Sequence, residues 1–172
     1  MKIEQAKSEL DWTKASNLLL RVVERLNELG RSLWTFEQVS IDGLKGYYQL
    51  NELYYLVDSD CIGVVFLQEI NPFFWPEVTK NDSLYVHKLA IDPVHSGKNL
   101  GQKALHAIVD EAKKHGYRWV RLDCDDRPEL HSFYQDFGFE LVDIKQMGEF
   151  QVARYQLLTS IGRECENAVP FP

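Results

Sequence analysis

The chain has 172 residues, of which 45% are hydrophobic and 26% are charged, as in a globular protein with one core. Acidic residues outnumber basic ones by 26 to 19, which argues against a nucleic-acid-binding protein that neutralises phosphates. The three cysteines are widely spaced and no apolar run is long, so the composition argues against a disulfide scaffold or a membrane span and favours the cytoplasm.

The first predicted element is a long amphipathic helix over residues 11–29. Its apolar side chains recur at helical spacing, from Trp12 onward. Asp11 is placed to cap its start, and Gly30 is suited to the left-handed position after its end. Residues 31–49 then predict a loop with a short helix.

Two strands and an aromatic loop are expected next. Residues 52–57 and 61–69 are rich in Tyr, Val, Ile and Phe, and predict strands on either side of a turn. In the loop that follows, Phe73, Phe74 and Trp75 cannot all point into a single-sided core. They form either a hydrophobic lid over neighbouring strands or, together with Trp12, a wall of an acceptor pocket.

A strand, helix and strand follow, at the spacing of a βαβ unit. Residues 83–92 are apolar on both sides, as in a central strand covered on both faces. Residues 100–115 carry a helical apolar stripe, and residues 119–124 form another strand. The two strands are therefore predicted to be parallel in one sheet.

The last elements are a helix and a hairpin. Residues 128–137 predict a helix with Pro128 in its first turn, and residues 140–158 predict a hairpin around Gly148. Residues 160–172 have no periodicity and are expected to be a loose tail. The whole chain, residues 1–172, is therefore expected to be a single domain.

The turn between the central strand and the next helix carries the most chemical information. It contains Gly97 and Gly101, which permit a tight backbone, and Asn99, which tolerates a left-handed conformation. Unpartnered N–H groups and the helix dipole would make such a turn an anion site, to which Lys98 and Ser96 add a charge and a hydroxyl donor.

Two common phosphate loops do not match this turn. A P-loop needs Lys followed by Ser or Thr, whereas Lys98 precedes Asn99. The Gly-x-Gly-x-x-Gly pattern of a dinucleotide fold is also absent. From the residues alone, diphosphate binding and a plain strand-to-helix connection remain equally open.

The strand, the turn, the helix and the later Tyr134 together resemble the GNAT superfamily of N-acetyltransferases. The family turn usually reads Gln or Arg, two residues, Gly, one residue, then Gly or Ala. Here Ser96 and Asn99 stand at the first two of these positions, and Gly101 keeps the last. The wider match includes the central strand at 84–93, and it extends over roughly residues 58–139.

The resemblance implies an α/β fold of the α+β type, with a mixed central sheet of about six or seven strands flanked by helices. It also implies acetyl-CoA as co-substrate, with its pyrophosphate on the turn and its pantetheine arm paired to the strand like an added strand. The residues implied to bind acetyl-CoA are Leu89, Ala90, Ile91, His95, Ser96, Gly97, Lys98, Asn99, Leu100, Gly101 and Gln102.

The resemblance further implies an enzyme that transfers acetyl to a primary amine of a small molecule or peptide by direct attack. Tyr134 matches the family tyrosine that protonates the CoA thiolate, a role that suits a phenol with a pKa of ~10. His87 is a candidate for the general base, and Glu69 could act through water. No metal site is expected, since the histidines lack metal-ligand spacing and His131 is interpreted as a surface or turn residue.

Other interpretations stay open. Because Ser96 and Asn99 depart from the family turn, the chain could instead be a non-catalytic acyl-CoA-binding sensor or regulatory module on the same fold. A longer acyl donor is a third possibility. The acceptor amine and the oligomeric state are not fixed by the residues, and a homodimer through exposed strand edges near the C-terminus is a further expectation.

Overall fold

The computed structural model describes residues 1–159, and the expected tail at 160–172 lies outside the described residues. The chain falls into two compact units. The first unit comprises residues 1–67 and 88–107, and the second comprises residues 68–87 and the chain from Ile108 onward. That the whole chain is a single domain stays a prediction.

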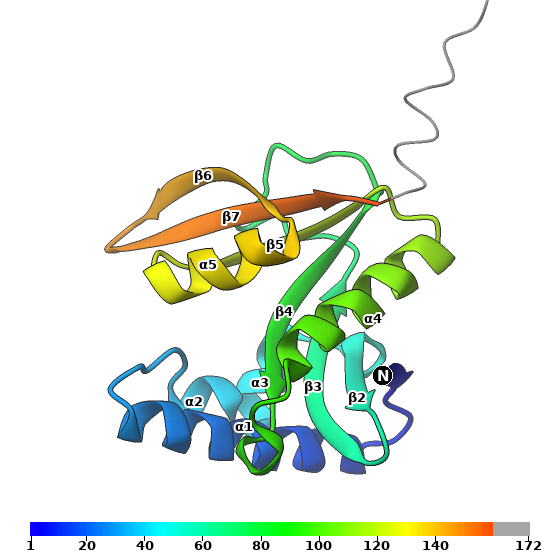
Figure 1. The fold of residues 1–172 in the computed structure, drawn as a ribbon, viewed down its shortest axis with the longest axis vertical. Helices are drawn as coiled ribbons and strands as arrows, with labels where there is room; N and C mark the ends of the chain where they lie inside the picture. Colours follow the sequence, from blue (N-terminus) through cyan, green and yellow to red (C-terminus); the bar gives the residue numbers. More distant parts are fainter. Residues whose placement is uncertain (160–172) are drawn as a thin grey trace, which may run out of the picture. The chain divides into compact units, whose positions relative to one another are not determined.

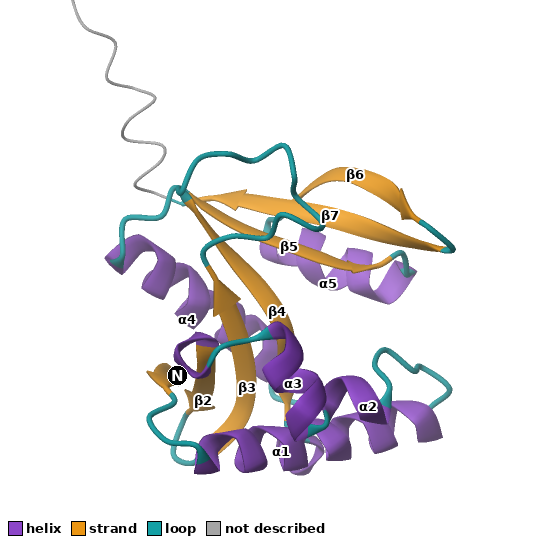
Figure 2. Ribbon diagram, turned by 180° about the vertical axis from the view of Figure 1, so that it is seen from behind, coloured by secondary structure: helices purple, strands orange, loops and turns teal. Residues whose placement is uncertain are grey.

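In the first unit, helices α1 and α3 lie on one side of the antiparallel strands, and the start of α4 (Leu100–Lys114), up to Ala107, lies on the other (Figures 1 and 2). Strand β1 pairs with β2, and β2 pairs with β3, in both cases antiparallel. The elements are β1 (Lys2–Gln5), α1 (Leu10–Glu28), α2 (Phe36–Val39), α3 (Ile41–Tyr47), the 3-10 turn η1 (Leu50–Glu52), β2 (Leu53–Val57), β3 (Cys61–Gln68), the end of β4 (Ser83–Ile91) and the 3-10 turn η2 (Pro93–His95). The predicted loop with one short helix thus contains two.

Helix α1 forms because its apolar residues fall on one face, and that face is buried. Leu19 and Val23 lie at most 1% exposed in the core of this unit, together with Phe66 of β3. Trp12 stacks on Phe66 with ring centroids 6.2 Å apart and is 3% exposed. Trp12 is therefore a core residue and is not available as a pocket wall, in contrast to one of the expectations above.

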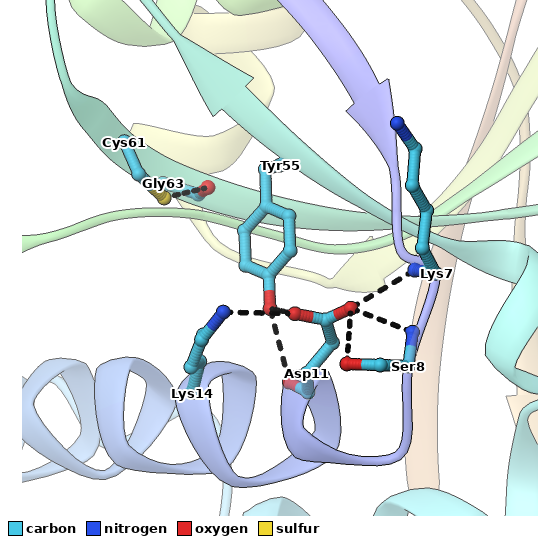
Figure 3. Close-up of polar contacts among 7 residues, drawn as sticks. All are labelled: Lys7, Ser8, Asp11, Lys14, Tyr55, Cys61 and Gly63. Atoms are coloured by element: carbon cyan, nitrogen blue, oxygen red, sulfur yellow. Dashed lines mark hydrogen bonds and ion pairs between the residues drawn. The ribbon is translucent and has the colours of Figure 1, made fainter.

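The start of α1 differs from the prediction in detail. The helix begins at Leu10, so Asp11 lies inside its first turn. Its carboxylate accepts the N–H groups of Lys7 and Ser8, both at 2.9 Å, and the Tyr55 hydroxyl at 3.1 Å (Figure 3). Asp11 therefore ties the segment before the helix to β2, and it does not cap the helical N–H groups. Gly30 takes the predicted left-handed conformation, with φ 67°.

The second unit is a curled sheet with helix α5 against it (Figure 1). Strands β4 and β5 are parallel, as predicted, whereas β5 with β7 and β6 with β7 are antiparallel. Its further elements are β5 (Trp119–Asp125), α5 (Pro128–Phe137), β6 (Glu140–Met147), β7 (Phe150–Leu158) and the end of α4 (Leu100–Lys114). The predicted hairpin of residues 140–158 is confirmed, with Gly148 at φ 65° in its turn.

The seven strands have the order β1-β2-β3-β4-β5-β7-β6. The predicted mixed sheet flanked by helices is therefore confirmed. Within residues 1–159, β1 is the strand that the sequence analysis missed. Its residues, Lys-Ile-Glu-Gln, are mostly exposed at a sheet edge, and the pattern has too few apolar positions to predict a strand.

Candidate functional site

The turn after β4 has an unusual backbone. Three consecutive residues, Gly97, Lys98 and Asn99, have positive φ values of 100°, 56° and 54°. Glycine adopts this region freely and asparagine tolerates it, but lysine does so at a cost of about 1 kcal/mol. Helix α4 begins immediately afterward at Leu100. The glycine and asparagine of the sequence pattern thus stand where the backbone requires them.

This conformation leaves donors exposed at the start of α4. The N–H groups of Gly97, Lys98 and Asn99 form no backbone hydrogen bond within residues 1–159, and all three residues are exposed. The first helical N–H groups of α4 add to them, together with the positive end of the helix dipole. The side chains of Lys98 and Ser96 are exposed beside these donors. Such an arrangement is suited to bind a phosphate or diphosphate.

The turn is anchored within the first unit by Asp92. The Asp92 carboxylate is buried, pairs with the Arg21 guanidinium of α1 and accepts the N–H of Val94 at 3.2 Å. The Asp92 N–H donates to the carbonyl of Ile62 on β3 at 2.8 Å. Arg21 lowers the pKa of the Asp92 carboxyl, so the carboxylate stays charged at neutral pH.

The segment of β4 predicted to bind pantetheine also lies in the first unit. Ala90 is buried, while Leu89 and Ile91 are half-buried. The preceding residue, Lys88, has a φ of 46°, and its ammonium lies 4.9 Å from the centroid of the Trp34 ring. Burial lowers the pKa of Lys88 to about 8. The register of β4 with β5 ends at Val86, before this segment begins.

Tyr134, the predicted general acid, lies on α5 in the second unit. Its half-buried ring packs edge-on against Phe139, with centroids 5.8 Å apart, and lies 5.6 Å from the ring of Tyr155. Burial, and then the neighbouring Cys124 and Asp123, raise the pKa of the Tyr134 phenol. The phenol is therefore protonated at neutral pH and able to donate a proton.

The surroundings of Cys124 make it a poor nucleophile. Burial, and then the charges of Asp123, Asp125 and Asp126, raise the pKa of its thiol to about 12. A thiol with this pKa is almost wholly protonated at neutral pH, and only the thiolate attacks carbonyl carbons efficiently.

The two base candidates also lie in the second unit. His87 is half-buried on β4. Glu69 is exposed, and the Tyr117 hydroxyl donates to its carboxylate at 2.5 Å. These contacts do not distinguish His87 from Glu69, so the general base stays a prediction.

His131, interpreted from the sequence as a surface or turn residue, is a half-buried residue of α5 with two polar partners. Its Nδ1 contacts the hydroxyl of the fully buried Tyr155, and its Nε2 lies 2.6 Å from the Asp126 carboxylate. The imidazole thus links the start of α5 to β7. No sequence signal marked this link, because Tyr155 is far along the chain.

The aromatic loop before β4 is clamped over β5 and β7. Trp75 is 2% exposed, with the Arg154 guanidinium 4.6 Å and the Arg121 guanidinium 5.4 Å from its ring centroid. Phe73, by contrast, is 65% exposed. The prediction that the three aromatic side chains do not all point into the core is confirmed.

The acetyl-CoA residues predicted from β4, the turn and α4 therefore form one continuous segment of the first unit. A model of the acetyltransferase (GNAT) family matches residues 19–139, which include this segment and Tyr134. The chain belongs to the GNAT acetyltransferase family. This GNAT protein is 26% identical over 146 residues to the uncharacterized N-acetyltransferase YesJ of Bacillus subtilis (strain 168), a match that covers 80% of this chain and 81% of YesJ.

Solved structures share the fold of this GNAT protein. A GNAT-family acetyltransferase from Listeria monocytogenes 4b F2365 aligns with a TM-score of 0.71, over 91% of this chain and 93% of that chain, at 17% identity. The ribosomal-protein-S18-alanine N-acetyltransferase of Escherichia coli aligns with a TM-score of 0.63, over 92% and 94%, at 14% identity. At these identities the likeness shows the fold alone.

Family membership makes the chain an N-acetyltransferase, and it implies an acyl-CoA donor and an amine acceptor. Within residues 1–159, no helix is both long and apolar enough to cross a membrane. The same residues contain no group of three or more His, Cys, Asp or Glu side chains placed to hold a metal ion.

Proposed function

We propose that this enzyme transfers acetyl from acetyl-CoA to a primary amine of a small molecule or peptide, by direct attack of the amine on the thioester. The observation that carries the proposal is the run of three left-handed residues, Gly97 to Asn99, at the start of α4. Their exposed N–H groups supply the donors that a pyrophosphate needs.

The residues of the first unit would hold acetyl-CoA. Backbone groups of Leu89, Ala90 and Ile91 would pair with the pantetheine arm, and the segment from His95 to Gln102 would hold the pyrophosphate. When bound, acetyl-CoA supplies an activated acyl group, and a preorganised amide such as that of Leu89 would stabilise the oxyanion that forms on amine attack.

Tyr134 would donate its phenolic proton to the departing CoA thiolate. Its raised pKa keeps the phenol protonated at neutral pH, so a proton is present on Tyr134 when the C–S bond breaks. Tyr134→Phe should lower turnover by about 100-fold or more, with acetyl-CoA binding retained. Tyr47→Phe is a control, since Tyr47 is 74% exposed in the first unit. Full turnover in Tyr134→Phe would remove this assignment.

A matched pair of variants tests the turn. Asn99→Gly keeps access to the left-handed backbone, whereas Asn99→Val introduces a β-branched side chain that disfavours it. At ~100 times its dissociation constant, acetyl-CoA should add about 2.7 kcal/mol of stability, which is a rise of several degrees in Tm. We expect this rise in the wild type and Asn99→Gly, a smaller one in Asn99→Val, and none with NADH or ATP. No rise in the wild type would refute the proposal.

The non-catalytic alternative rested on the departures at Ser96 and Asn99. Asn99 adopts the left-handed backbone that glycine would provide, so this departure keeps the geometry of the turn. Release of CoA in the presence of an amine panel separates the two functions, since a sensor module would bind acetyl-CoA without turnover.

We also propose a homodimer through β6, the last strand of the sheet order. This edge strand exposes Leu141, Val142 and Ile144, which are 39–47% accessible. Exposed apolar edges favour pairing with a second copy. Sedimentation of the wild type and of Ile144→Lys tests the proposal, and a wild-type monomer at micromolar concentration would refute it.

The chemical class of the acceptor amine is less closely defined than the donor. The Escherichia coli structural neighbour is named for acetylation of an alanine of a ribosomal protein, but at 14% identity it shares only the fold. The excess of acidic residues favours a cationic acceptor.

A further inference from the structure

The face of β5 beneath the aromatic loop carries a carboxylate, Asp123, that the proposed function has not used. Asp123 is half-buried and lies opposite Arg154 of β7 in the antiparallel register. The side-chain amide of Asn71 donates to its Oδ1 at 3.0 Å. Asn71 is itself 7% exposed, and its own Oδ1 accepts the N–H of Phe74 at 3.2 Å. Asn71 is thus held at both ends and fixes the orientation of the carboxylate.

The cations on this face are committed to other partners. The Arg154 guanidinium donates to both carboxylate oxygens of Asp143, at 2.7 and 2.6 Å, to Glu77 at 2.5 Å and to the Phe74 carbonyl at 2.8 Å. The Arg121 guanidinium contacts Ser83 and Asp82. Among the described residues, no ion pair includes Asp123. The carboxylate is therefore half-buried, and the nearby guanidinium of Arg154 is bound directly to other carboxylates.

This environment tunes the acidity of Asp123. Burial raises the pKa of the Asp123 carboxyl to about 6, against smaller opposing effects of Asn71, Trp75 and Arg154. The carboxylate is consequently charged at neutral pH, yet it is basic enough to accept a proton. A desolvated charge without a partner is costly, and a bound ammonium ion would offset that cost.

We propose that Asp123 binds the ammonium group of the acceptor and takes its proton, with Asn71 as the positioning residue. The inference rests on the proposed acetyl transfer. The N–H bond of the ammonium breaks and an O–H bond forms on Asp123, which leaves a neutral amine. The amine nitrogen then bonds to the thioester carbon, the C–S bond breaks, and the thiolate receives the Tyr134 proton. The amide nitrogen loses its second proton to the Tyr134 phenolate, and Asp123 returns its proton to solvent.

A purely structural carboxylate would look different. Asp11, for comparison, accepts two backbone N–H groups and pairs with Lys14, so its charge is fully compensated in the fold. Asp123 instead accepts from side chains of the aromatic loop, and Arg154, its neighbour across the strands, pairs directly with Asp143 and Glu77. Replacing Asp11 should therefore destabilise the protein, whereas replacing Asp123 should remove function and leave stability unchanged or improved.

The first test needs neither acetyl-CoA nor knowledge of the acceptor. Thermal unfolding is measured at pH 7.5 in n-butylammonium chloride and in sodium chloride of equal ionic strength. The wild type is compared with Asp123→Asn and with Asp125→Asn, which changes the carboxylate two positions along β5 that pairs with Arg127 at 2.7 Å. We expect butylammonium to raise the Tm of the wild type and Asp125→Asn, but not that of Asp123→Asn.

In sodium chloride, Asp123→Asn should unfold at the wild-type temperature or above it. A lower Tm would assign Asp123 a structural role and overturn the proposal. An equal response of all three proteins to butylammonium, or none in the wild type, would overturn it too.

The second test is the pH dependence of kcat/KM, with whichever amine of a panel gives the highest turnover. In the wild type, kcat/KM should fall on the acidic side of about pH 6, as Asp123 becomes protonated. Asp123→Asn should lower kcat/KM by about 100-fold or more and abolish this acidic limb of the profile. Asn71→Ala should move this limb to higher pH, because the Asn71 hydrogen bond lowers the pKa of Asp123. Asp125→Asn should leave the limb in place.

Other titratable or charged groups around this face are Arg154 and Asp143 of the β6–β7 hairpin, Glu77 of the loop, Arg121 of β5 and Tyr134 of α5, and His87 lies on β4, the strand that pairs with β5. Of these, His87 ionises nearest this pH range in its unperturbed state, so His87→Gln is measured in parallel. If His87→Gln loses the acidic limb of kcat/KM and Asp123→Asn keeps it, then His87 is the base and the proposal for Asp123 is wrong.

The two proposals fail in different ways. If acetyl-CoA gives no thermal stabilisation and no amine releases CoA, the proposed function fails. If acetyl-CoA stabilises the enzyme and turnover occurs, but Asp123→Asn keeps the limb, only the role of Asp123 fails.

Discussion

The hydrogen bonds around Asp11 predict a large and local loss of stability in Asp11→Ala. The carboxylate is 6% exposed and accepts two backbone N–H groups, from Lys7 and Ser8, at 2.9 Å each (Figure 3). A hydrogen bond to a charged group contributes about 1.5–3 kcal/mol. Lys7 and Ser8 are exposed, so water replaces part of the loss. We therefore expect a cost of about 3 kcal/mol, near the low end of the two-bond sum.

For a chain of this size, 1 kcal/mol corresponds to about 2–4 °C in Tm, so Asp11→Ala should unfold about 6–12 °C below the wild type. Asp11→Asn keeps one acceptor oxygen and should lose about half as much. Asp42→Ala is the control, because Asp42 is an exposed acid in the first turn of α3 and contributes about 0.3–1 kcal/mol through the helix dipole.

The pH dependence provides an independent check. The N–H group of Lys7, and then the other donors, hold the pKa of the Asp11 carboxyl well below its usual value of 3.8. A lowered pKa in the folded state stabilises the protein above the unfolded pKa, and this stabilisation is lost as the pH falls below about 4. The acid limb of Tm against pH should therefore be shallower in Asp11→Asn. A loss under 2 °C in Asp11→Ala, or an unchanged acid limb in Asp11→Asn, would refute this reasoning about the cluster.

Three further variants test the packing by thermal unfolding. In Gly63→Ala the new Cβ would lie 2.3 Å from the Ala90 carbonyl oxygen, so β3 and β4 must separate and we expect a loss above about 3 kcal/mol; a stable variant would contradict this close approach. Arg154→Met removes a buried guanidinium from two solvent-exposed carboxylates, Asp143 and Glu77, which water can then hydrate, and should cost about 1.5–3 kcal/mol, whereas a cost below 1 kcal/mol would show the network to be dispensable. Lys88→Met should stabilise the protein by about 1–2 kcal/mol at pH 7. Because the pKa of Lys88 is lowered from 10.5 to about 8, this gain should shrink as the pH rises from 8 to 10.5, and a gain constant over that interval would exclude the ammonium as its cause.

Most of the fold could be predicted from the sequence because its elements carry strong patterns. Helix α1 has an apolar stripe, and α5 is bounded by Pro128 and a left-handed Gly138 at φ 114°. Strand β1 escaped prediction because it is a short, polar edge strand held by backbone pairing with β2. Backbone pairing leaves no trace in side-chain periodicity, and polar edge strands are therefore the elements that patterns miss.

The part of the candidate site formed by consecutive residues could be predicted, whereas contacts between residues far apart in the sequence could not. The segment predicted to bind acetyl-CoA runs without a break from β4 into α4, so its motif can be read along the chain. The bond between Asn71 and Asp123 joins residues 52 positions apart, and the contact of His131 with Tyr155 spans 24. No sequence spacing predicts either contact, because the positions of loops and strands are set by the packing of the whole unit.

The turn also explains why a family motif can change without loss of its geometry. A positive φ requires a residue without steric strain in the left-handed region, and asparagine meets this requirement nearly as well as glycine. Asn99 has a φ of 54°, so it provides the backbone that the family glycine provides. The residue under strain is instead Lys98, at φ 56°, a position where the family pattern makes no demand. The proposed binding of acetyl-CoA therefore depends on the backbone N–H groups of the turn, and asparagine at position 99 leaves their left-handed geometry in place.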